Sequence, residues 1–328
     1  MLPLPAFEWR TPSTVAELVG ALAERPETTL IIGGGTDLVP NLKHGLFAPE
    51  RLISLRRVDE LATIEDLPDG GLAIGAAVTL DRISRDDRLG ARFPALVQAA
   101  RLVASPQIRR MATLGGNLLL DTRCRYYNQT AFWRGALGHC LKKDGDVCHV
   151  VPQGKRCVAA LAADTPAPLI AYGATVELVS VRGTRSLPVA QLYAGDGIKN
   201  HIRAADEVLT RILLPARRAG LQSAYEKLRA RQAIDFPLLS VAVVVEVDDR
   251  ALVREARVVV GALGAKPRIV GGLDVVYGQA LSAETIATIA KAAHAQCHPL
   301  ASLGAADWRQ DVVAPVVQRA LTALQPSR

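Results

Sequence analysis

Four clustered cysteines mark the part of this chain where chemistry is expected. The cysteines Cys124, Cys140, Cys148 and Cys157 follow the pattern C-x15-C-x7-C-x8-C, and the fifth, Cys297, lies far downstream. Four thiolates can hold a tetrahedral zinc ion or a cubane iron–sulfur cluster. The pattern matches neither the compact bacterial ferredoxin motif nor paired C-x2-C zinc motifs. It therefore leaves zinc, a [4Fe-4S] cluster and disulfides open as alternatives.

The segment around these cysteines has a composition of its own. It is poor in aliphatic residues and rich in charged ones, and His139 and His149 adjoin cysteines as alternative ligands. Its charged residues are Arg123, Arg125, Arg134, Lys142, Lys143, Lys155 and Arg156 against Asp121, Asp144 and Asp146. The basic side chains can stabilise an anionic cluster, dock an acidic protein or simply be solvated. We interpret residues 121–160 as an insertion held together by metal rather than by a hydrophobic core.

A glycine run after an apolar stretch is the second candidate site. Residues 29–32 predict a short buried strand that leads directly into the run. The residues concerned are Ile32, Gly33, Gly34, Gly35, Thr36 and Asp37. Glycines lack a Cβ atom, so their N–H groups can surround an anion closely. The run predicts either a pyrophosphate cradle or a tight turn. It lacks the fingerprints of Rossmann folds and of phosphate-binding P-loops.

A second glycine turn lies further along the chain. It runs from Thr113 through Gly115 and Gly116 to Asn117. Each turn alone is weak evidence for a ligand. Together they predict two loops that meet around one extended ligand.

The composition of the whole chain limits the classes of protein to consider. With 328 residues, 49% of them hydrophobic, the chain is long enough for two or three domains and is not disordered. Its net charge of +7 is modest and no nucleic-acid-binding motif accompanies it, so we expect no nucleic-acid partner. We also expect no membrane association, because no apolar run reaches the ~20 residues of a membrane helix. The first residues lack the features of a signal peptide, which predicts a cytoplasmic protein whose clustered cysteines bind metal.

Periodicity and capping residues predict the elements of the first half. Thr11, followed by proline, predicts the start of a helix that ends at Pro26. Residues 69–71 predict a hairpin, Thr79 the cap of a short helix, and residues 94–103 a second helix. The glycine turns are therefore expected at junctions between strands and helices.

The second half is predicted to contain mainly strands. Residues 169–174 and 175–179 predict a strand pair, residues 207–212 predict a further strand, and residues 217–220 predict a boundary. Beyond it we expect strands at residues 223–229, 239–247 and 257–263, a helix beginning at Ser282, and a helix over residues 308–324.

Several of these stretches resemble the motifs of one family, the FAD-binding subunits of molybdenum hydroxylases (the xanthine oxidase family). Residues 31–38 and 107–117 are similar to its two flavin motifs, and residues 164–169 to the Ser-Asp-x-x-Pro stretch that follows them. Further similar blocks are residues 224–227, 262–267 and 307–309. The six blocks occur in the family's order and cover nearly the whole chain.

The resemblance implies an α+β fold. We expect a two-lobed FAD-binding domain of the molybdenum hydroxylase flavoprotein type with a metal-cluster loop insertion, followed by a smaller C-terminal α+β domain. The expected ranges are 1–55 for the N-terminal lobe, 56–217 for the second lobe with the insertion at about 121–160, and 218–328 for the C-terminal domain. The second glycine turn and Asp164 lie close together in typical members, whereas here the cysteines separate them. In this respect the chain is most similar to the middle (beta) subunit of 4-hydroxybenzoyl-CoA reductase.

The resemblance also implies which residues bind FAD. They are Ile32, Gly33, Gly34, Gly35, Thr36, Asp37, Thr113, Gly116, Asn117, Asp164 and Lys227. The glycine turns would hold the pyrophosphate, and Asp164 would accept a hydrogen bond from a ribityl hydroxyl. Lys227 would lie near the isoalloxazine, where a cation favours the reduced, anionic flavin. No residue of this chain is expected to be catalytic.

The implied function is electron transfer through FAD and a [4Fe-4S] cluster bound by the four clustered cysteines. The expected partners are a molybdopterin-containing large subunit and a [2Fe-2S] small subunit in a dimer of heterotrimers, with an external ferredoxin-like electron donor. The expected enzyme is 4-hydroxybenzoyl-CoA reductase, which removes the phenolic hydroxyl to give benzoyl-CoA. Two alternatives remain: a flavin subunit of the CO or aldehyde dehydrogenase type, and a zinc-stapled scaffold without redox chemistry.

Overall fold

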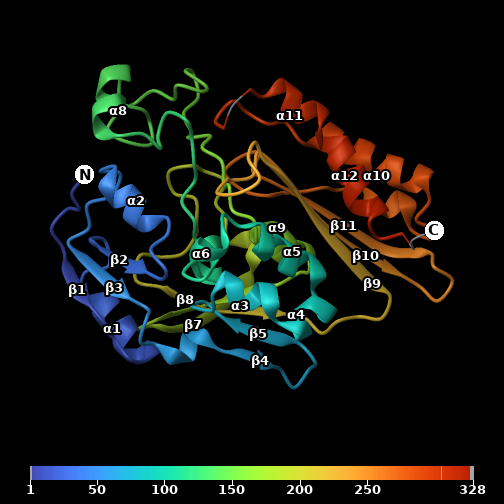
Figure 1. Ribbon diagram of the computed structural model, residues 1–328, viewed down its shortest axis with the longest axis horizontal. Helices are drawn as coiled ribbons and strands as arrows, with labels where there is room; N and C mark the ends of the chain where they lie inside the picture. The colour runs from blue at the N-terminus through green and yellow to red at the C-terminus, as the bar shows by residue number, and fades with distance from the viewer. Residues whose placement is uncertain (1, 304, 326–328) are drawn as a thin grey trace.

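Three β-sheets organise the chain, and each forms where short apolar runs alternate with turns. The computed structural model describes residues 2–303 and 305–325 (Figure 1). The strand orders are β1-β3-β2 in a parallel sheet, and β4-β5-β8-β6-β7 and β12-β11-β10-β9 in two antiparallel sheets. The architecture is therefore α+β, which confirms the predicted class. None of the described helices is long and apolar enough to cross a membrane.

The parallel sheet carries the first glycine turn. It contains β1 (Glu8–Arg10), β2 (Thr29–Ile32) and β3 (Arg51–Ser54), with helices α1 (Val15–Glu24) and α2 (Leu38–Lys43). Successive residues of a strand point to opposite faces, so Ile53 packs with α1 while Leu52 packs with α2. Since β2 ends at Ile32, the glycines leave the sheet at its carboxyl edge, where open parallel sheets commonly bind ligands.

Helix α1 begins later than its sequence predicts. Thr14, rather than Thr11, is the N-cap, and its hydroxyl oxygen accepts a hydrogen bond from the Glu17 N–H at 3.1 Å. The Glu17 carboxylate in turn accepts from the Ser13 N–H at 2.8 Å. These reciprocal bonds resemble a capping box and satisfy donors that a start at Thr11 would leave unpaired, so the predicted cap is wrong.

The second sheet and its helices form the largest core. The strands are β4 (Ile64–Asp66), β5 (Leu72–Gly75), β6 (Thr175–Ser180), β7 (Gly183–Pro188) and β8 (Val208–Leu214). The helices are α3 (Leu80–Arg85), α4 (Asp87–Arg92), α5 (Pro94–Leu102), α6 (Pro106–Arg109), α7 (Leu114–Leu118) and α9 (Pro166–Ala171), with 3-10 turns η1 (Asp59–Ala62) and η2 (Val189–Gln191). The predicted hairpin joins β4 to β5, and Thr79 caps α3 as predicted.

The strand predicted for residues 169–174 is wrong. Residues Pro166–Ala171 form helix α9, whose six residues are all buried. Proline is favourable in the first turn of a helix, and a short run that is apolar on every side does not distinguish a buried helix from a buried strand. The predicted partner does form a strand, β6, but it pairs with β7 and β8.

The central strand of the third sheet, β10, is buried on both faces. The sheet contains β9 (Leu221–Leu228), β10 (Leu239–Val247), β11 (Val253–Gly261) and β12 (Arg268–Ile269), followed by η3 (Leu273–Val276), α10 (Ala283–Gln296), α11 (Asp307–Asp311) and α12 (Val313–Thr322). Val243 of β10 packs in the core with α10 and α12, while Val244 packs in the core with α5 and α9. This explains the uninterrupted apolar run of β10. The single helix predicted for residues 308–324 is divided into α11 and α12.

The cysteine segment, residues 121–160, leaves and rejoins the fold at one point. Arg123 and Ala160 form an antiparallel bridge in which each N–H donates to the other's carbonyl, at 2.7 and 2.8 Å. Between them lies helix α8 (Ala131–Leu137), drawn in green near α2 in Figure 1. The predicted domain limits stay predictions, and their outermost residues, 1 and 326–328, lie outside the described residues.

The C-terminal domain contains a fully buried arginine in its last motif. The Arg309 guanidinium donates to the carbonyl oxygens of Leu238 at 2.9 Å, Leu300 at 3.1 Å and Ala262 at 2.5 Å. It thereby ties α11 to β10 and to the chain after β11. Removing it would leave buried carbonyl oxygens without donors, which is costly.

We therefore predict that Arg309→Met lowers the free energy of unfolding by about 2–4 kcal/mol. Arg319→Met is the matched control, because Arg319 is exposed and its ion-pair partner within the described residues is the Glu226 carboxylate at 2.9 Å. The control should cost less than about 1 kcal/mol. Denaturant unfolding of the two variants measures the difference, and equal losses would contradict the structural role of Arg309.

Candidate functional site

The two glycine turns touch through their backbones. A Cβ atom on Gly34 would lie 1.7 Å from the Met111 carbonyl oxygen, and one on Gly33 would lie 2.9 Å from the Thr113 hydroxyl oxygen. No residue other than glycine fits at position 34 without moving the backbone. The Thr113 hydroxyl also accepts from the Gly116 N–H at 3.1 Å, which holds the second turn at the start of α7.

A cavity of about 570 Å³ opens where these turns meet. That volume lies within the usual range for a small-molecule or cofactor site. Ten of the eleven residues expected to bind the cofactor line it: Ile32, Gly33, Gly34, Gly35, Thr36, Asp37, Thr113, Gly116, Asn117 and Asp164. The eleventh, Lys227, is not among the lining residues. The structure thus gathers residues from the end of β2 and the turn after it, from α7, and from the chain just before α9, which are far apart in sequence.

Lys227 supports the cavity wall from behind. Its ammonium group lies 3.0 Å from the Asp164 carboxylate and donates to the carbonyl oxygens of Leu102 and Asp235, also at 3.0 Å. The Tyr225 hydroxyl donates to the other carboxylate oxygen at 2.7 Å. Burial raises the pKa of Asp164, and the Lys227 charge and the Tyr225 hydrogen bond oppose that rise. The arrangement fixes the Asp164 carboxylate in place, and a direct contact of Lys227 with a flavin stays a prediction.

Arg123 also lines the larger cavity, although no sequence motif predicts this role. Its guanidinium lies 3.0 Å from one carboxylate oxygen of Asp37, and its carbon lies 4.0 Å from the ring centre of Phe236. The other Asp37 oxygen accepts from the Asn41 amide at 2.8 Å. Both Arg123 and Phe236 line the cavity. No motif marks them, because Phe236 reaches Arg123 only through the folding of the loop between β9 and β10.

The four clustered cysteines line one small cavity of their own. Cys124, Cys140, Cys148 and Cys157 are buried free thiols, whereas Cys297 lies in the core of the C-terminal domain. Burial raises the pKa of Cys124, and that of Cys157 to about 11. The described residues contain no disulfide.

Two further observations bear on the contents of this cavity. Nowhere in residues 2–303 and 305–325 do three or more His, Cys, Asp or Glu side chains converge as they would on a single metal ion. His149 lines the cavity and lies 2.9 Å from the Gly138 carbonyl oxygen, whereas His139 is exposed. The four thiols therefore line one small cavity, but the described side chains are not arranged around a single metal ion.

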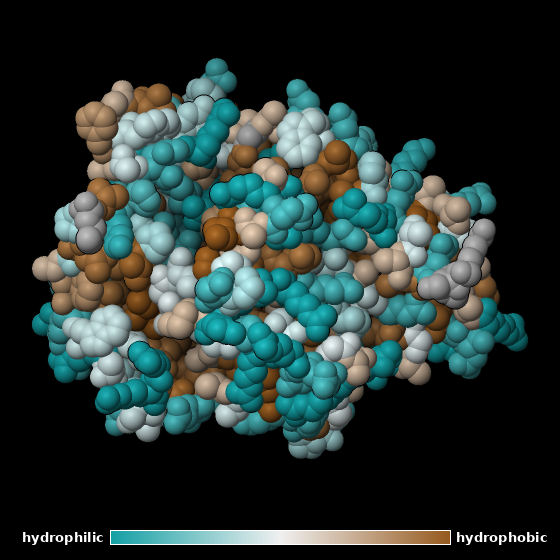
Figure 2. Space-filling model, in the orientation of Figure 1, coloured by the Kyte–Doolittle hydropathy of each residue, from teal (hydrophilic) through white to brown (hydrophobic). Residues whose placement is uncertain are grey.

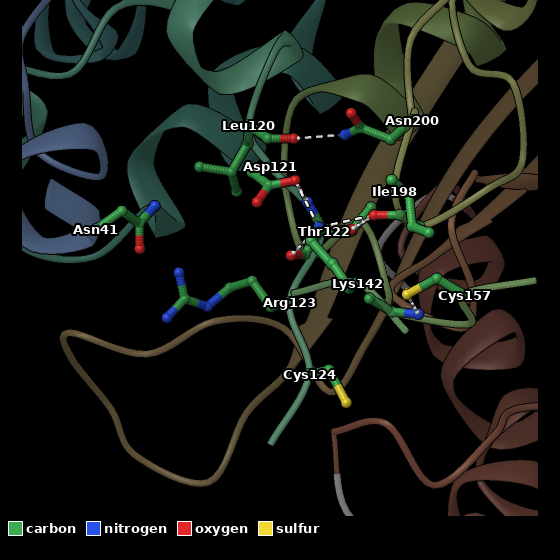
Figure 3. A network of polar contacts seen from close by, with 12 residues as sticks. Asn41, Leu120, Asp121, Thr122, Arg123, Cys124, Lys142, Cys157, Ile198 and Asn200 are labelled. Atoms are coloured by element: carbon green, nitrogen blue, oxygen red, sulfur yellow. Dashed lines mark hydrogen bonds and ion pairs between the residues drawn. The ribbon is translucent and has the colours of Figure 1, made fainter. Parts of the chain in front are cut away.

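The two cavities share a wall. Asp121 and Arg123 line the larger one, and the next residue, Cys124, lines the smaller one. In Figure 3 the Arg123 guanidinium extends toward Asn41, while the Cys124 thiol points elsewhere. A group bound by the cysteines would therefore be separated from a ligand of the larger cavity by little more than one stretch of chain.

Comparison with known proteins identifies both parts of the chain. Residues 5–217 match the family described as the FAD binding domain in molybdopterin dehydrogenase, and residues 223–324 match the CO dehydrogenase flavoprotein C-terminal domain. The carbon monoxide dehydrogenase medium chain of Hydrogenophaga pseudoflava is 28% identical over 325 residues, covering 98% of each chain. The aldehyde oxidoreductase FAD-binding subunit PaoB of Escherichia coli (strain K12) is 30% identical over 289 residues, covering 85% of this chain and 88% of PaoB.

The fold matches solved structures over the same extent. A carbon monoxide dehydrogenase structure from Hydrogenophaga pseudoflava, which lacks the Mo-pyranopterin moiety of its molybdenum cofactor, superimposes with a TM-score of 0.79. The sequences are 27% identical, and the match covers 98% of both chains. The two-part architecture is thus shared along nearly the whole length.

Because the two glycine turns touch, a single methyl group added at Gly34 should disturb the larger cavity. Gly34→Ala should reduce the FAD content of the purified protein to below about one tenth of the wild-type value, because the two turns must separate to admit the Cβ atom. The ratio of flavin to protein absorbance measures this loss. Gly20→Ala in α1 is the control, since nothing lies within 4 Å of its Cβ position, and it should retain FAD. Full flavin content in Gly34→Ala would contradict the assignment of the turns.

Proposed function

The chain belongs to the FAD-binding medium subunits of molybdenum hydroxylases, the xanthine oxidase family, and we propose that it transfers electrons through two centres, FAD and a [4Fe-4S] cluster. It is an oxidoreductase subunit. In this proposal it has no substrate site of its own. The observation that carries the proposal is the pair of neighbouring cavities, one lined by glycine turns and one by four buried thiols.

The larger cavity supports FAD binding at the predicted residues. The glycines allow the two turns to touch, and both turns line the cavity, where backbone N–H groups would hold a pyrophosphate. Asp164, held by Lys227 and Tyr225, offers a carboxylate of fixed orientation to a ribityl hydroxyl. Bound FAD would accept or release one or two electrons, and the chain's part is to position it and to exclude water.

The smaller cavity offers a donor set for a metal centre, because four buried thiols line it. Four thiolates would hold either a zinc ion or a cubane cluster. The cluster is preferred in this proposal because the cysteine insertion resembles that of the middle subunit of 4-hydroxybenzoyl-CoA reductase. The zinc-stapled scaffold remains the alternative that metal analysis tests.

The surface of the cysteine segment supports an external electron donor. Helix α8 exposes Phe132, Trp133 and Leu137, and apolar side chains are visible beside hydrophilic ones in the α8 region at the upper left of Figure 2. The exposed basic residues Arg125, Lys155 and Arg156 belong to the same segment. The segment thus exposes both apolar and basic side chains, and basic side chains are complementary to an acidic ferredoxin-like protein. We further propose that electrons pass on to [2Fe-2S] and molybdenum centres of small and large partner subunits, in a dimer of heterotrimers.

The substrate of the partner has two candidates. Reductive removal of the hydroxyl of 4-hydroxybenzoyl-CoA consumes two electrons and two protons and releases water, and a second redox centre that accepts electrons from a low-potential donor suits this reaction. The similarity to carbon monoxide dehydrogenase and aldehyde oxidoreductase subunits favours a hydroxylase-type or CO-oxidising complex instead. Co-purification from the native source, followed by assays of both reactions, distinguishes the two. The expected cytoplasmic location stays a prediction.

The proposal predicts the metal content of the protein. Anaerobically purified protein should contain FAD and about four iron atoms per chain. Cys140→Ser should lose most of this iron and keep FAD, because Cys140 lines only the smaller cavity. Cys297→Ala is the control and should keep both, since Cys297 lies in the C-terminal core.

Metal analysis and optical spectra measure these contents. One zinc ion per chain without iron would support the scaffold instead. Loss of FAD in parallel with iron would contradict the independence of the two cavities.

A further inference from the structure

Lys142 is a buried cation at the junction of the two cavities. Its side chain is 5% exposed, and its ammonium group lies within hydrogen-bonding distance of four acceptors. These are one carboxylate oxygen of Asp121 at 2.7 Å, the hydroxyl and carbonyl oxygens of Thr122 at 2.5 and 3.1 Å, and the Gly197 carbonyl oxygen at 2.7 Å. The ammonium also lies 4.4 Å from the ring centre of Tyr127. Figure 3 shows dashed lines from Lys142 to this surrounding network.

The same network reaches the thiols. Lys142 lines the cysteine cavity, and it is the only lysine or arginine among the lining residues in the described part of the chain. The Gly197 N–H donates to the Cys157 carbonyl at 2.9 Å, and a Cβ atom on Gly197 would lie 2.6 Å from the Cys157 sulfur. The loop that accepts a hydrogen bond from Lys142 is therefore packed against a thiol.

The network also reaches the wall of the larger cavity. Asp121 lines that cavity, and Thr122, which is fully buried, donates from its hydroxyl to the Gly197 carbonyl at 2.6 Å. Lys142 thus connects the cysteine segment, the wall at Asp121 and the loop at Gly197. Among the described residues Asp121 is the carboxylate that pairs with it, and the pair is oriented: Lys142 lines the cysteine cavity, whereas Asp121 lines the larger one. The positive end of the pair therefore lies on the side of the thiols.

Neighbouring Lys143 has different surroundings. Its ammonium lies 3.4 Å from Asp144, both side chains are partly exposed, and Lys143 does not line the cysteine cavity. Two lysines adjacent in sequence therefore place one charge in a buried network and the other in contact with solvent, where it is screened.

We propose that Lys142 is a positioning residue for electron transfer, whose fixed positive charge raises the reduction potential of the cysteine-bound centre. The inference rests on the proposed function, because it requires a redox centre at the four cysteines. Reduction adds one electron, and hence one negative charge, to the centre without making or breaking a bond. A buried cation beside the thiolates stabilises the reduced form more than the oxidised form.

The test measures reduction potentials rather than turnover. Lys142→Gln and the matched control Lys143→Gln are introduced into the full chain in its native complex, and the cluster is titrated with redox dyes and followed by EPR. We expect Lys142→Gln to lower the equilibrium constant for cluster reduction about tenfold, equivalent to about 59 mV for one electron, and Lys143→Gln to leave it unchanged. The flavin potential, followed optically, should change less than that of the cluster.

A variant that raises the cluster potential distinguishes an electrostatic effect of the Lys142 charge from a local loss of structure. Asp121→Asn removes the counter-charge of Lys142, so it should raise the cluster potential, whereas Lys142→Arg keeps the charge and should stay near the wild-type value. If Lys142→Gln fails to assemble, the Asp121→Asn and Lys142→Arg results decide. Two outcomes would overturn the inference in protein that contains iron. One is a cluster potential that stays unchanged in Lys142→Gln, and the other is a cluster potential that falls in both Lys142→Gln and Asp121→Asn. Wild-type protein without iron would overturn the proposed function itself.

Discussion

The Gly34 backbone lies so close to the Met111 carbonyl that no side chain fits between them. This contact holds the carboxyl edge of the parallel sheet against the turn that starts α7. The larger cavity, the proposed FAD site, is the space left beside it, and the lining residues from the other elements are placed relative to this contact. Because the contact joins backbone atoms, neighbouring side chains cannot make room for a side chain at Gly34 by changing their rotamers. The glycine turns therefore determine the shape of the site more strongly than any single polar residue does.

The sequence predicts such a contact unusually well. Glycines after a buried strand have few structural alternatives, so all predicted residues of both turns line the cavity. Lys227 shows where this reasoning stops. Its position on β9 follows from the pattern, but its pairing with Asp164 depends on how the third sheet packs against α5 and α9. Similarly, Arg123 meets Phe236 across a loop whose path no local pattern specifies.

The errors in secondary structure have a common cause. Residues 166–171 were ambiguous because a helix buried on all sides has no polar face, so its periodicity carries no information. The start of α1 was misplaced because two threonines compete as caps, and the reciprocal bonds with Glu17 decide between them. The conformation of residues 166–171 and the start of α1 both depend on contacts that the periodicity of the sequence does not contain. Strand β10 was predicted correctly because its apolar run was long and rich in β-branched residues.

The cysteines illustrate how a weak local pattern acquires meaning through topology. Their spacing alone does not distinguish a cluster, zinc or disulfides. The bridge between Arg123 and Ala160 closes the segment at its base, and all four thiols line one cavity. Arg123 and Cys124 are consecutive residues that line different cavities, so only a short stretch of chain separates the two. Under the proposed function, the buried ion pair of Asp121 and Lys142, whose cation lies on the side of the thiols, would act on a centre bound there with little screening by solvent.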